Sequence, residues 1–236
     1  MPKKYWYVII TYIIAQLSGL VVAPIIKVLN VDPFTASVSW NVISFVAALL
    51  VTMYLLRDEI RQVCKRGATK ISNVLLWSFL GIFLAYFAQI GSIIIETFVL
   101  GIKPGSQNTF DIMNIARAAP IFILIISIIA PVLEEVIFRK IIFGSIYKRS
   151  NFIIAGLASA LIFGLVHNDN PHILTYTAMG LVFAFLYVHT KRIIVPIIAH
   201  AAINTYAVIG QLSIDPEEID RMLEEFEKIQ MILIGG

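Results

Sequence analysis

The chain has 236 residues, of which 59% are hydrophobic and only 14% are charged, and its mean hydropathy is +0.87. This composition is too apolar for a soluble globular protein of that length and predicts a polytopic protein embedded in the lipid bilayer. The net charge of +3 gives no reason to expect a nucleic-acid partner, because the basic residues fall between the apolar runs. The single cysteine, Cys64, excludes a disulfide framework within one chain and is expected to be a free cytosolic thiol.

Apolar runs of about 17 to 25 residues are long enough to cross, as helices, a hydrocarbon core about 30 Å thick. Such runs predict an all-α transmembrane helix bundle of seven to eight spans. In chain order the expected spans are 5–29, 38–56, 74–98, 118–138, 152–167, 173–189 and 193–210. No linker or repeat divides them, so a single membrane domain covering 1–236 is predicted, with the chemically informative residues in the core 118–210.

The distribution of Lys and Arg between the spans predicts the orientation of the chain. With the N-terminus in the cytosol, thirteen of the 18 basic residues lie on the cytosolic side and five lie outside, as the positive-inside rule requires. The five that are expected outside are Lys27, Lys103, Arg117, Arg221 and Lys228.

Two segments outside the spans have patterns of their own. Residues 101–117 form the longest polar break and are expected to be an extracytoplasmic loop without catalytic residues. After the last span, Asp215, Pro216 and Glu218 have the pattern of a helix start, with a cap, a proline at the first helical position and a glutamate three residues after the cap. They predict an acidic helix over 215–234, whose apolar stripe packs on the protein or on the bilayer surface.

Two adjacent glutamates, Glu134 and Glu135, lie in the fourth expected span. A carboxylate at bilayer depth costs about 2.5 to 3.5 kcal/mol, so a chain that carries two of them there is expected to use them. Glu135 and Arg139 are four residues apart, share a helical face in the favourable order of acid before base, and are interpreted as a structural ion pair. Glu134 is rotated about 100° away from Glu135, which predicts that it faces a cavity between helices.

Two histidines and an asparagine lie in the later spans. His167 ends the fifth expected span, and His200 and Asn204 share a face of the seventh at four-residue spacing. A carboxylate and a neutral imidazole that converge on one water molecule can remove its proton, so Glu134 and His167 predict general-base hydrolysis of an amide. Asn204 and His200 could donate hydrogen bonds to the oxygen that becomes negative when water adds to a peptide carbonyl.

The same residues leave a metal site open. Glu134, His167 and His200 form a plausible three-ligand zinc set with an open fourth position. The sequence has no H-E-x-x-H motif, and an asparagine one turn after a histidine is a poor zinc ligand, so a mechanism without a cofactor is expected. It also has no G-x-S-x-G motif, which favours attack by water over a covalent intermediate.

The expected spans place Glu134 near the cytosolic side of the membrane and His167 toward the opposite side, at about 1.5 Å of rise per residue. A shared pocket therefore requires shifted helix boundaries or a displaced or tilted fifth helix. Among the remaining polar residues, Asn168, Asp169 and His172 are interpreted as a solvated turn between spans. Glu96 is expected to be snorkelling or paired.

Three short motifs, in this order on successive membrane helices, resemble those of the CAAX protease and bacteriocin-processing family, also called the ABI family. They are Glu134-Glu135-x-x-x-Arg139, Phe163-x-x-x-His167 and His200-x-x-x-Asn204. The resemblance implies an intramembrane endopeptidase of the type II CAAX prenyl protease kind. It implies that Glu134 and His167 activate water and that His200 and Asn204 form the oxyanion site, and it leaves supporting roles to Glu135, Arg139 and Phe163.

The compact size resembles that of bacterial family members associated with bacteriocin immunity or with processing and export of signalling peptides, rather than the larger prenyl proteases. The implied location is a bacterial plasma membrane, and the implied substrate is a membrane-associated peptide or a protein C-terminus. Three alternatives stay open. They are a non-catalytic peptide-binding or immunity protein, a zinc-dependent version of the same protease, and a small transporter that uses Glu134 and the histidines as a proton relay.

Overall fold

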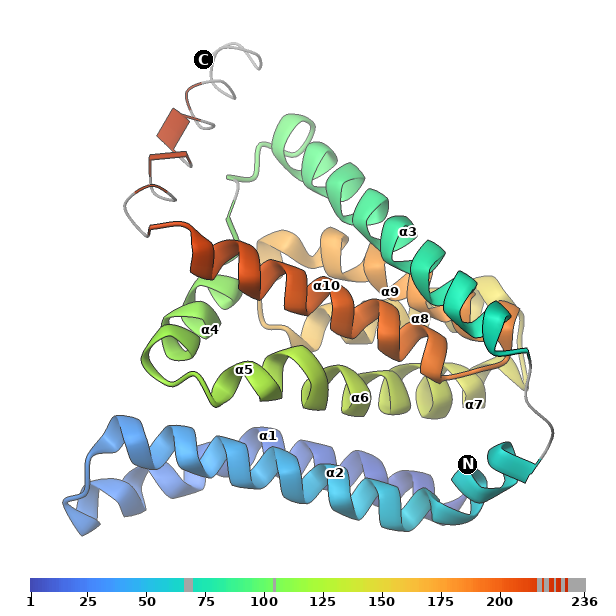
Figure 1. Cartoon of the computed structure of the whole chain (residues 1–236), viewed down its shortest axis with the longest axis horizontal. Helices are drawn as coiled ribbons and strands as arrows, with labels where there is room; N and C mark the ends of the chain where they lie inside the picture. Colours follow the sequence, from blue (N-terminus) through green and yellow to red (C-terminus); the bar gives the residue numbers. More distant parts are fainter. Residues whose placement is uncertain are drawn as a thin grey trace.

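A computed structural model describes residues 1–65, 70–103 and 105–215, together with residues 218, 221, 222, 224, 225 and 228. Every regular element in this part of the chain is a helix, as the sequence predicts (Figure 1). Most of the acidic helix expected over 215–234 lies outside the described residues, as does the side chain of Cys64.

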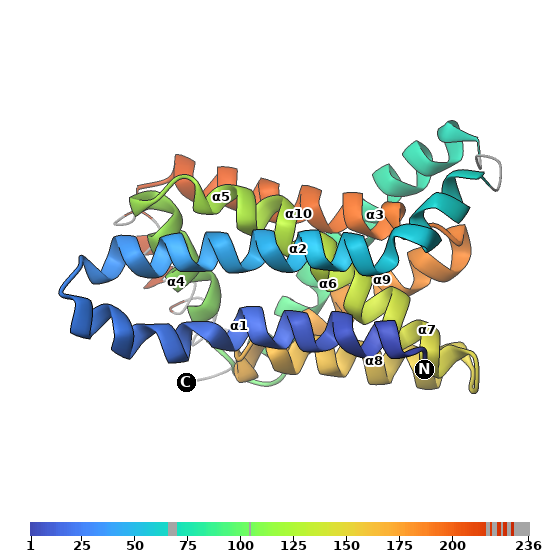
Figure 2. The same ribbon diagram turned by 90° about the horizontal axis from the view of Figure 1, so that it is seen from below.

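The first two helices form an antiparallel hairpin, visible as the two neighbouring rods in Figure 2. Helix α1 covers Lys3–Leu29 and helix α2 covers Pro33–Lys65. Asn30 ends α1 in the left-handed conformation at φ 53°, which asparagine tolerates better than most residues. The carboxylate of Asp32 then accepts a hydrogen bond from the Thr35 backbone N–H at 2.7 Å and caps the start of α2.

Glu59 of α2 connects this hairpin to the rest of the bundle. Its carboxylate lies 2.5 Å from Lys4 Nζ of α1 and 2.7 Å from Lys140 Nζ, and it accepts a hydrogen bond from the Tyr5 hydroxyl at 3.1 Å. Below this polar contact, Tyr12 and Phe45 of the hairpin pack with Phe138 in a common hydrophobic core. The hairpin therefore lies directly against the helix that carries the glutamate pair.

That helix is continuous from Phe122 to Tyr147 but changes its hydrogen-bond register twice. It consists of α5 Phe122–Leu124, a π-helix η1 Ile125–Ile129, α6 Ala130–Glu135, a π-helix η2 Val136–Phe143 and α7 Gly144–Tyr147. The predicted boundaries 118–138 were wrong, because they start too early and end too early. The observed helix places Glu134 near its middle, which removes much of the conflict in depth with His167.

The remaining long helices form a layer on the other side of this interrupted helix (Figure 1). They are α3 Ile71–Phe98, α8 Phe152–Val166, α9 Ile173–Thr190 and α10 Ile194–Ser213. Small residues let α8 and α9 approach closely: a Cβ at Gly180 would lie only 3.0 Å from the Cβ of Ala160. Close packing at this crossing buries Phe163 among the site residues.

Five described helices are long and apolar enough to cross a membrane, namely α1, α2 up to Gln62, α3, the segment Asn170–Thr190 and α10. Together with the shorter apolar α8 and the interrupted helix, they account for the seven predicted spans. The polar break is not simply a loop, however. Its second half forms α4, Gln107–Ala118, whose Met113 and Ala116 pack against Val208 of α10.

Candidate active site

Glu135 and Arg139 form the predicted ion pair in the centre of the bundle. Arg139 Nε lies 3.1 Å from Glu135 Oε2, and both side chains have no exposed surface. The guanidinium also lies over the rings of Phe163, at 4.6 Å, and Phe183, at 5.5 Å. Its Nη atoms have no hydrogen-bond partner among the described residues, so the carboxylate and the aromatic faces supply its stabilisation.

His200 lies between the two glutamates. Its Nδ1 is 3.0 Å from Glu135 Oε1, and its Nε2 is 3.7 Å from Glu134 Oε2. The ring stacks on Phe183 at a centroid distance of 4.8 Å and a plane angle of 17°. Because Nδ1 faces a carboxylate oxygen of the glutamate that is paired with Arg139, we assign the Nδ1 proton to the hydrogen bond with Glu135. Nε2 is then the nitrogen directed toward Glu134.

Glu134 is the more accessible member of the glutamate pair, with 13% of its side-chain surface exposed. It has no cation at salt-bridge distance other than His200 among the described residues. Glu134 is therefore partly accessible, whereas Glu135 is fully buried beside Arg139.

Asn204 is held at the site by a hydrogen bond to a backbone carbonyl that the neighbouring helix leaves without an N–H donor. Ala130 N–H bonds to the Ile125 carbonyl in the π register, so the next carbonyl, that of Ile126, would accept from residue 131. Residue 131 is a proline and has no N–H. Asn204 Nδ2 donates to the Ile126 carbonyl instead, at 3.0 Å. Since an amide NH₂ group has two donors, one remains for another acceptor.

His167 follows the last residue of α8 and is fixed through one nitrogen. Its Nδ1 lies 2.7 Å from the carbonyl oxygen of Phe163, one turn earlier. A carbonyl only accepts, so Nδ1 carries the proton and the neutral ring presents a lone pair at Nε2. The imidazole also contacts the Phe163 ring at 4.5 Å and stacks on Tyr176 at 4.1 Å.

These contacts bring together the residues predicted from sequence. Glu134 and His200 approach directly, and Asn204 lies on the same helix as His200, one turn further on. The two imidazoles contact the same Phe163 ring, because its centroid is 5.8 Å from that of His200. Glu135 and Arg139 support this group from the side opposite Glu134. All seven predicted residues therefore lie in one region of the bundle.

A second buried carboxylate, Glu96, corrects the interpretation of the 168–172 turn. Glu96 is 1% exposed and accepts hydrogen bonds from Thr175 N–H and Thr175 Oγ1, both at 2.9 Å. His172 Nδ1 lies 2.9 Å from the same carboxylate, and its Nε2 lies 2.9 Å from the Gly105 carbonyl. Glu96 is therefore paired, His172 belongs to a partly buried contact, and Asp169 is buried, whereas Asn168 is exposed as a solvated turn predicts.

Replacing Glu96 by leucine is expected to lower the free energy of unfolding by about 3 kcal/mol, because His172 and the first turn of α9 lose their buried acceptor. The loss should be seen as a lower apparent melting temperature of the purified protein in detergent. Glu96→Gln is the matched control. It keeps a hydrogen-bond acceptor at the same place, so its melting temperature should fall less than that of Glu96→Leu. Equal melting temperatures for Glu96→Leu and the wild type would contradict this role.

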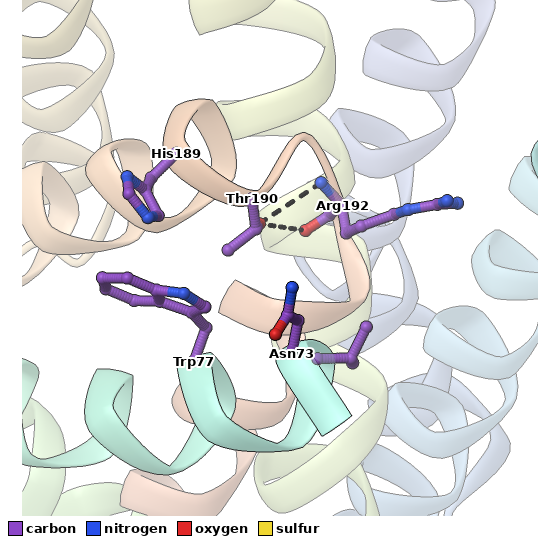
Figure 3. A pocket seen from close by; sticks show the side chains of 6 residues that line it. Asn73, Trp77, His189, Thr190 and Arg192 are labelled. Atoms are coloured by element: carbon purple, nitrogen blue, oxygen red, sulfur yellow. Dashed lines mark hydrogen bonds between the residues drawn. The ribbon is translucent and has the colours of Figure 1, made fainter. Parts of the chain in front are cut away.

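A separate cavity of about 140 Å³ lies between the start of α3 and the junction of α9 with α10 (Figure 3). It is lined by Asn73, Val74, Trp77, His189, Thr190 and Arg192. The His189 ring contacts Trp77 in a tilted arrangement, with ring centroids 4.0 Å apart, so His189 belongs to the wall of this cavity. None of the seven predicted site residues lines the cavity.

Reasoning from the sequence missed several contributors to the site. Phe183 and Tyr176 are two of many aromatic residues in apolar spans, and nothing in their spacing distinguishes them. Pro131 did carry a signal, because a proline inside a span frees a carbonyl that must find another donor. That signal points to an unsatisfied acceptor near the glutamate pair but not to Asn204 as its partner.

Matches to known proteins assign this helical bundle to a class of membrane peptidases. The family described as type II CAAX prenyl endopeptidase Rce1-like matches residues 116–206, which include every predicted catalytic residue. The chain is 43% identical over 245 residues to YdiL of Bacillus subtilis (strain 168), which is provisionally named a membrane peptidase, with 100% of this chain and 99% of the relative covered. The chain therefore belongs to this family of intramembrane peptidases.

A second relative supports the same assignment. The chain is 35% identical over 238 residues to MroQ of Staphylococcus aureus (strain USA300), named a membrane-embedded CAAX protease, with 96% of each chain covered. A shorter match of 83 residues, at 32% identity, covers 35% of this chain and 45% of the UPF0177 protein YxdF of Lactococcus lactis subsp. lactis (strain IL1403). No solved structure matches the chain significantly.

Proposed function

We propose that this chain is an endopeptidase that hydrolyses a peptide bond with a water molecule activated by Glu134 and His167. The observation that carries the proposal is the position of His200 Nε2, 3.7 Å from Glu134, while Glu135 is held by Arg139 and by His200 Nδ1. Glu135 is thereby held in a structural ion pair, and Glu134 keeps a carboxylate oxygen available for proton transfer. The lone pair at His167 Nε2 provides a second acceptor for the same water.

In this mechanism the water oxygen attacks the peptide carbonyl carbon while its proton moves to the Glu134 carboxylate. The electrons of the carbonyl π bond move to the oxygen, which becomes an oxyanion. This oxyanion accepts hydrogen bonds from the remaining Asn204 N–H and from His200 Nε2–H. The C–N bond then breaks, and the proton held by Glu134 passes to the leaving amine. His200 can donate from Nε2 only as an imidazolium. In that form Glu134, Glu135, Arg139 and His200 carry a total charge of zero.

The proposed substrate is a membrane-associated peptide or a protein C-terminus in a bacterial plasma membrane, processed in bacteriocin immunity or in peptide signalling. Glu134 is near the middle of its helix, so a scissile bond must enter the bundle to reach it. The proposed orientation places the N-terminus and the basic residues that contact Glu59 in the cytosol. MroQ is named as a CAAX protease, which supports a related substrate class for this chain.

The experiment that tests the proposal compares cells that carry the wild type with cells that carry Glu134→Gln, by mass spectrometry of membrane-derived peptides. Peptides with new termini should appear only with the wild type. Incubating the purified wild type in liposomes with synthetic versions of those peptides should then reproduce the cleavage. Identical peptide profiles for the two strains would overturn the proposal in favour of a binding or immunity protein.

We propose that the reaction uses no metal ion. The zinc set considered from sequence was Glu134, His167 and His200, but no group of three His, Cys, Asp or Glu side chains in the described part of the chain gathers at metal-binding distance. Glu134, His167 and His200 therefore do not gather into a three-ligand zinc site in this structure.

Peptidase activity in liposomes is accordingly expected to survive treatment with 1,10-phenanthroline followed by removal of the chelator and bound metal by gel filtration. The measurement is the initial rate of peptide cleavage before and after treatment, with a zinc peptidase treated in parallel as the control. A loss of more than about tenfold that added zinc restores would show that Glu134 and the histidines rearrange to bind metal.

A further inference from the structure

Tyr176 of α9 lies flat against the imidazole of His167. Their ring centroids are 4.1 Å apart, and their planes differ by 24°. We propose that Tyr176 is a positioning residue for the reaction, because it sets the plane of the His167 ring so that Nε2 faces the water held by Glu134. This inference rests on the proposed function, in which that lone pair accepts from the attacking water.

The Tyr176 hydroxyl is held by residues of the segment that leads into α4. It lies 3.2 Å from Ser106 Oγ and 3.4 Å from Asn108 Nδ2. Ser106 Oγ has one proton, which it donates to Asp169 Oδ2 at 2.5 Å, and it accepts from Thr109 N–H at 3.1 Å as the cap of α4. The Tyr176 hydroxyl must therefore donate to Ser106 and accept from Asn108.

These hydrogen bonds fix the position of the Tyr176 hydroxyl. Ser106 donates once and accepts twice, which uses its full capacity, and Tyr176 donates once and accepts once. The segment is fastened a second time nearby, because His172 Nε2 faces the carbonyl of Gly105 and its Nδ1 faces Glu96. Polar contacts of Tyr176 and His172 therefore join the start of α4 to the start of α9, and Tyr176 projects from that junction onto His167.

His167 needs such a contact because its own hydrogen bond is insufficient. The bond from Nδ1 to the Phe163 carbonyl fixes one atom of the ring, but it allows the ring to tilt about that atom. Phe163 touches the ring at an angle of 64°, so it limits motion from a single direction only. A stacked phenol over the face of the imidazole restricts the tilt. A shift of about 1 Å in a catalytic group can cost about 100-fold in rate.

Tyr176→Leu removes the stacked ring, whereas Tyr176→Phe keeps the ring and removes only the hydroxyl. We expect Tyr176→Leu to lower kcat by about 10- to 100-fold with little change in KM, and Tyr176→Phe to retain at least a third of kcat. Rates are measured in liposomes with a peptide that the wild type cleaves and Glu134→Gln does not. Tyr187→Leu is the matched control, because Tyr187 is on the same helix and contacts Phe143 rather than the site.

The position of the imidazole is measured independently of activity by NMR of histidine-labelled protein, since the chain has only four histidines. The His167 ring signals should move in Tyr176→Leu, through loss of the ring current, and stay near the wild-type position in Tyr176→Phe. If Tyr176→Leu does not fold, Tyr176→Met takes its place.

A kcat within threefold of the wild type for the leucine or methionine variant would overturn the inference. Equal losses of kcat in Tyr176→Phe and Tyr176→Leu would assign the effect to the hydroxyl and overturn the stacking role. A comparable loss in Tyr187→Leu would show a general effect of cavities in α9. If Glu134→Gln stays active, the proposed function fails instead, and the NMR comparison still decides whether Tyr176 orients the ring.

Discussion

Glu134→Gln is expected to lower kcat of peptide hydrolysis by about 100- to 10,000-fold, which is the range that a positioned general base contributes. Glutamine has the same shape but cannot take a proton from water, so the attacking nucleophile is lost while the helix is kept. Glu134 is partly exposed and lies 3.7 Å from its nearest cationic partner, so its replacement should change the melting temperature little. The measurements are the cleavage rate in liposomes and thermal unfolding in detergent.

Glu59→Gln is the control for this variant. Glu59 is also a glutamate of a membrane helix, but it contacts Lys4, Lys140 and Tyr5 at a distance from the histidines. We expect this change to reduce stability more than it reduces the rate constant. A Glu134→Gln protein that cleaves at the wild-type rate would exclude Glu134 as the base and overturn the proposed function.

The second large effect is expected on stability, from Arg139→Met. Arg139 is completely buried, and its removal leaves the Glu135 charge with His200 as its remaining partner. Breaking a buried pair by removing one member costs about 3 to 5 kcal/mol. The contacts of the guanidinium with Phe163 and Phe183 are lost as well. The free energy of unfolding should therefore fall by about that amount, or the protein should fail to accumulate in the membrane.

A double-mutant cycle separates the ion pair from simple loss of packing. Glu135→Gln, Arg139→Met and the double variant are compared by denaturation in mixed micelles. If the two charges stabilise each other, the double variant loses less stability than the sum of the single variants, by about 0.5 to 3 kcal/mol. Strictly additive losses would mean that Arg139 acts through its aromatic contacts alone.

Several features of the fold follow from sequence rules that act locally. Apolar runs of bilayer length predicted the long helices, because a backbone in lipid must satisfy its hydrogen bonds internally. The four-residue spacing predicted the Glu135–Arg139 pair and the shared face of His200 and Asn204, since helical geometry alone brings such residues together. The same geometry predicted that Glu134 points away from Arg139.

Local rules failed where the chain departs from a regular helix. The two π-helical segments on either side of α6 shift the register, and the interrupted helix runs to Tyr147 instead of ending near Arg139. Helix α4 was missed because its segment is polar on average, although Met113 and Ala116 bury one side of it against α10. Amphipathic burial of this kind depends on a partner that the segment itself does not contain.

The sequence by itself determined the membrane class, most of the long helices and which polar side chains are candidates for the chemistry, because each of these depends on composition or on spacing within one helix. Only the tertiary structure decided that His200 lies between the two glutamates, that Asn204 occupies the carbonyl left free by Pro131, and that Glu96 pairs with His172. Each of these contacts joins residues more than sixty positions apart, so it exists only after the helices have packed. Tyr176 belongs to the same class, since its contact with His167 depends on the close crossing of α8 and α9 and on the start of α4.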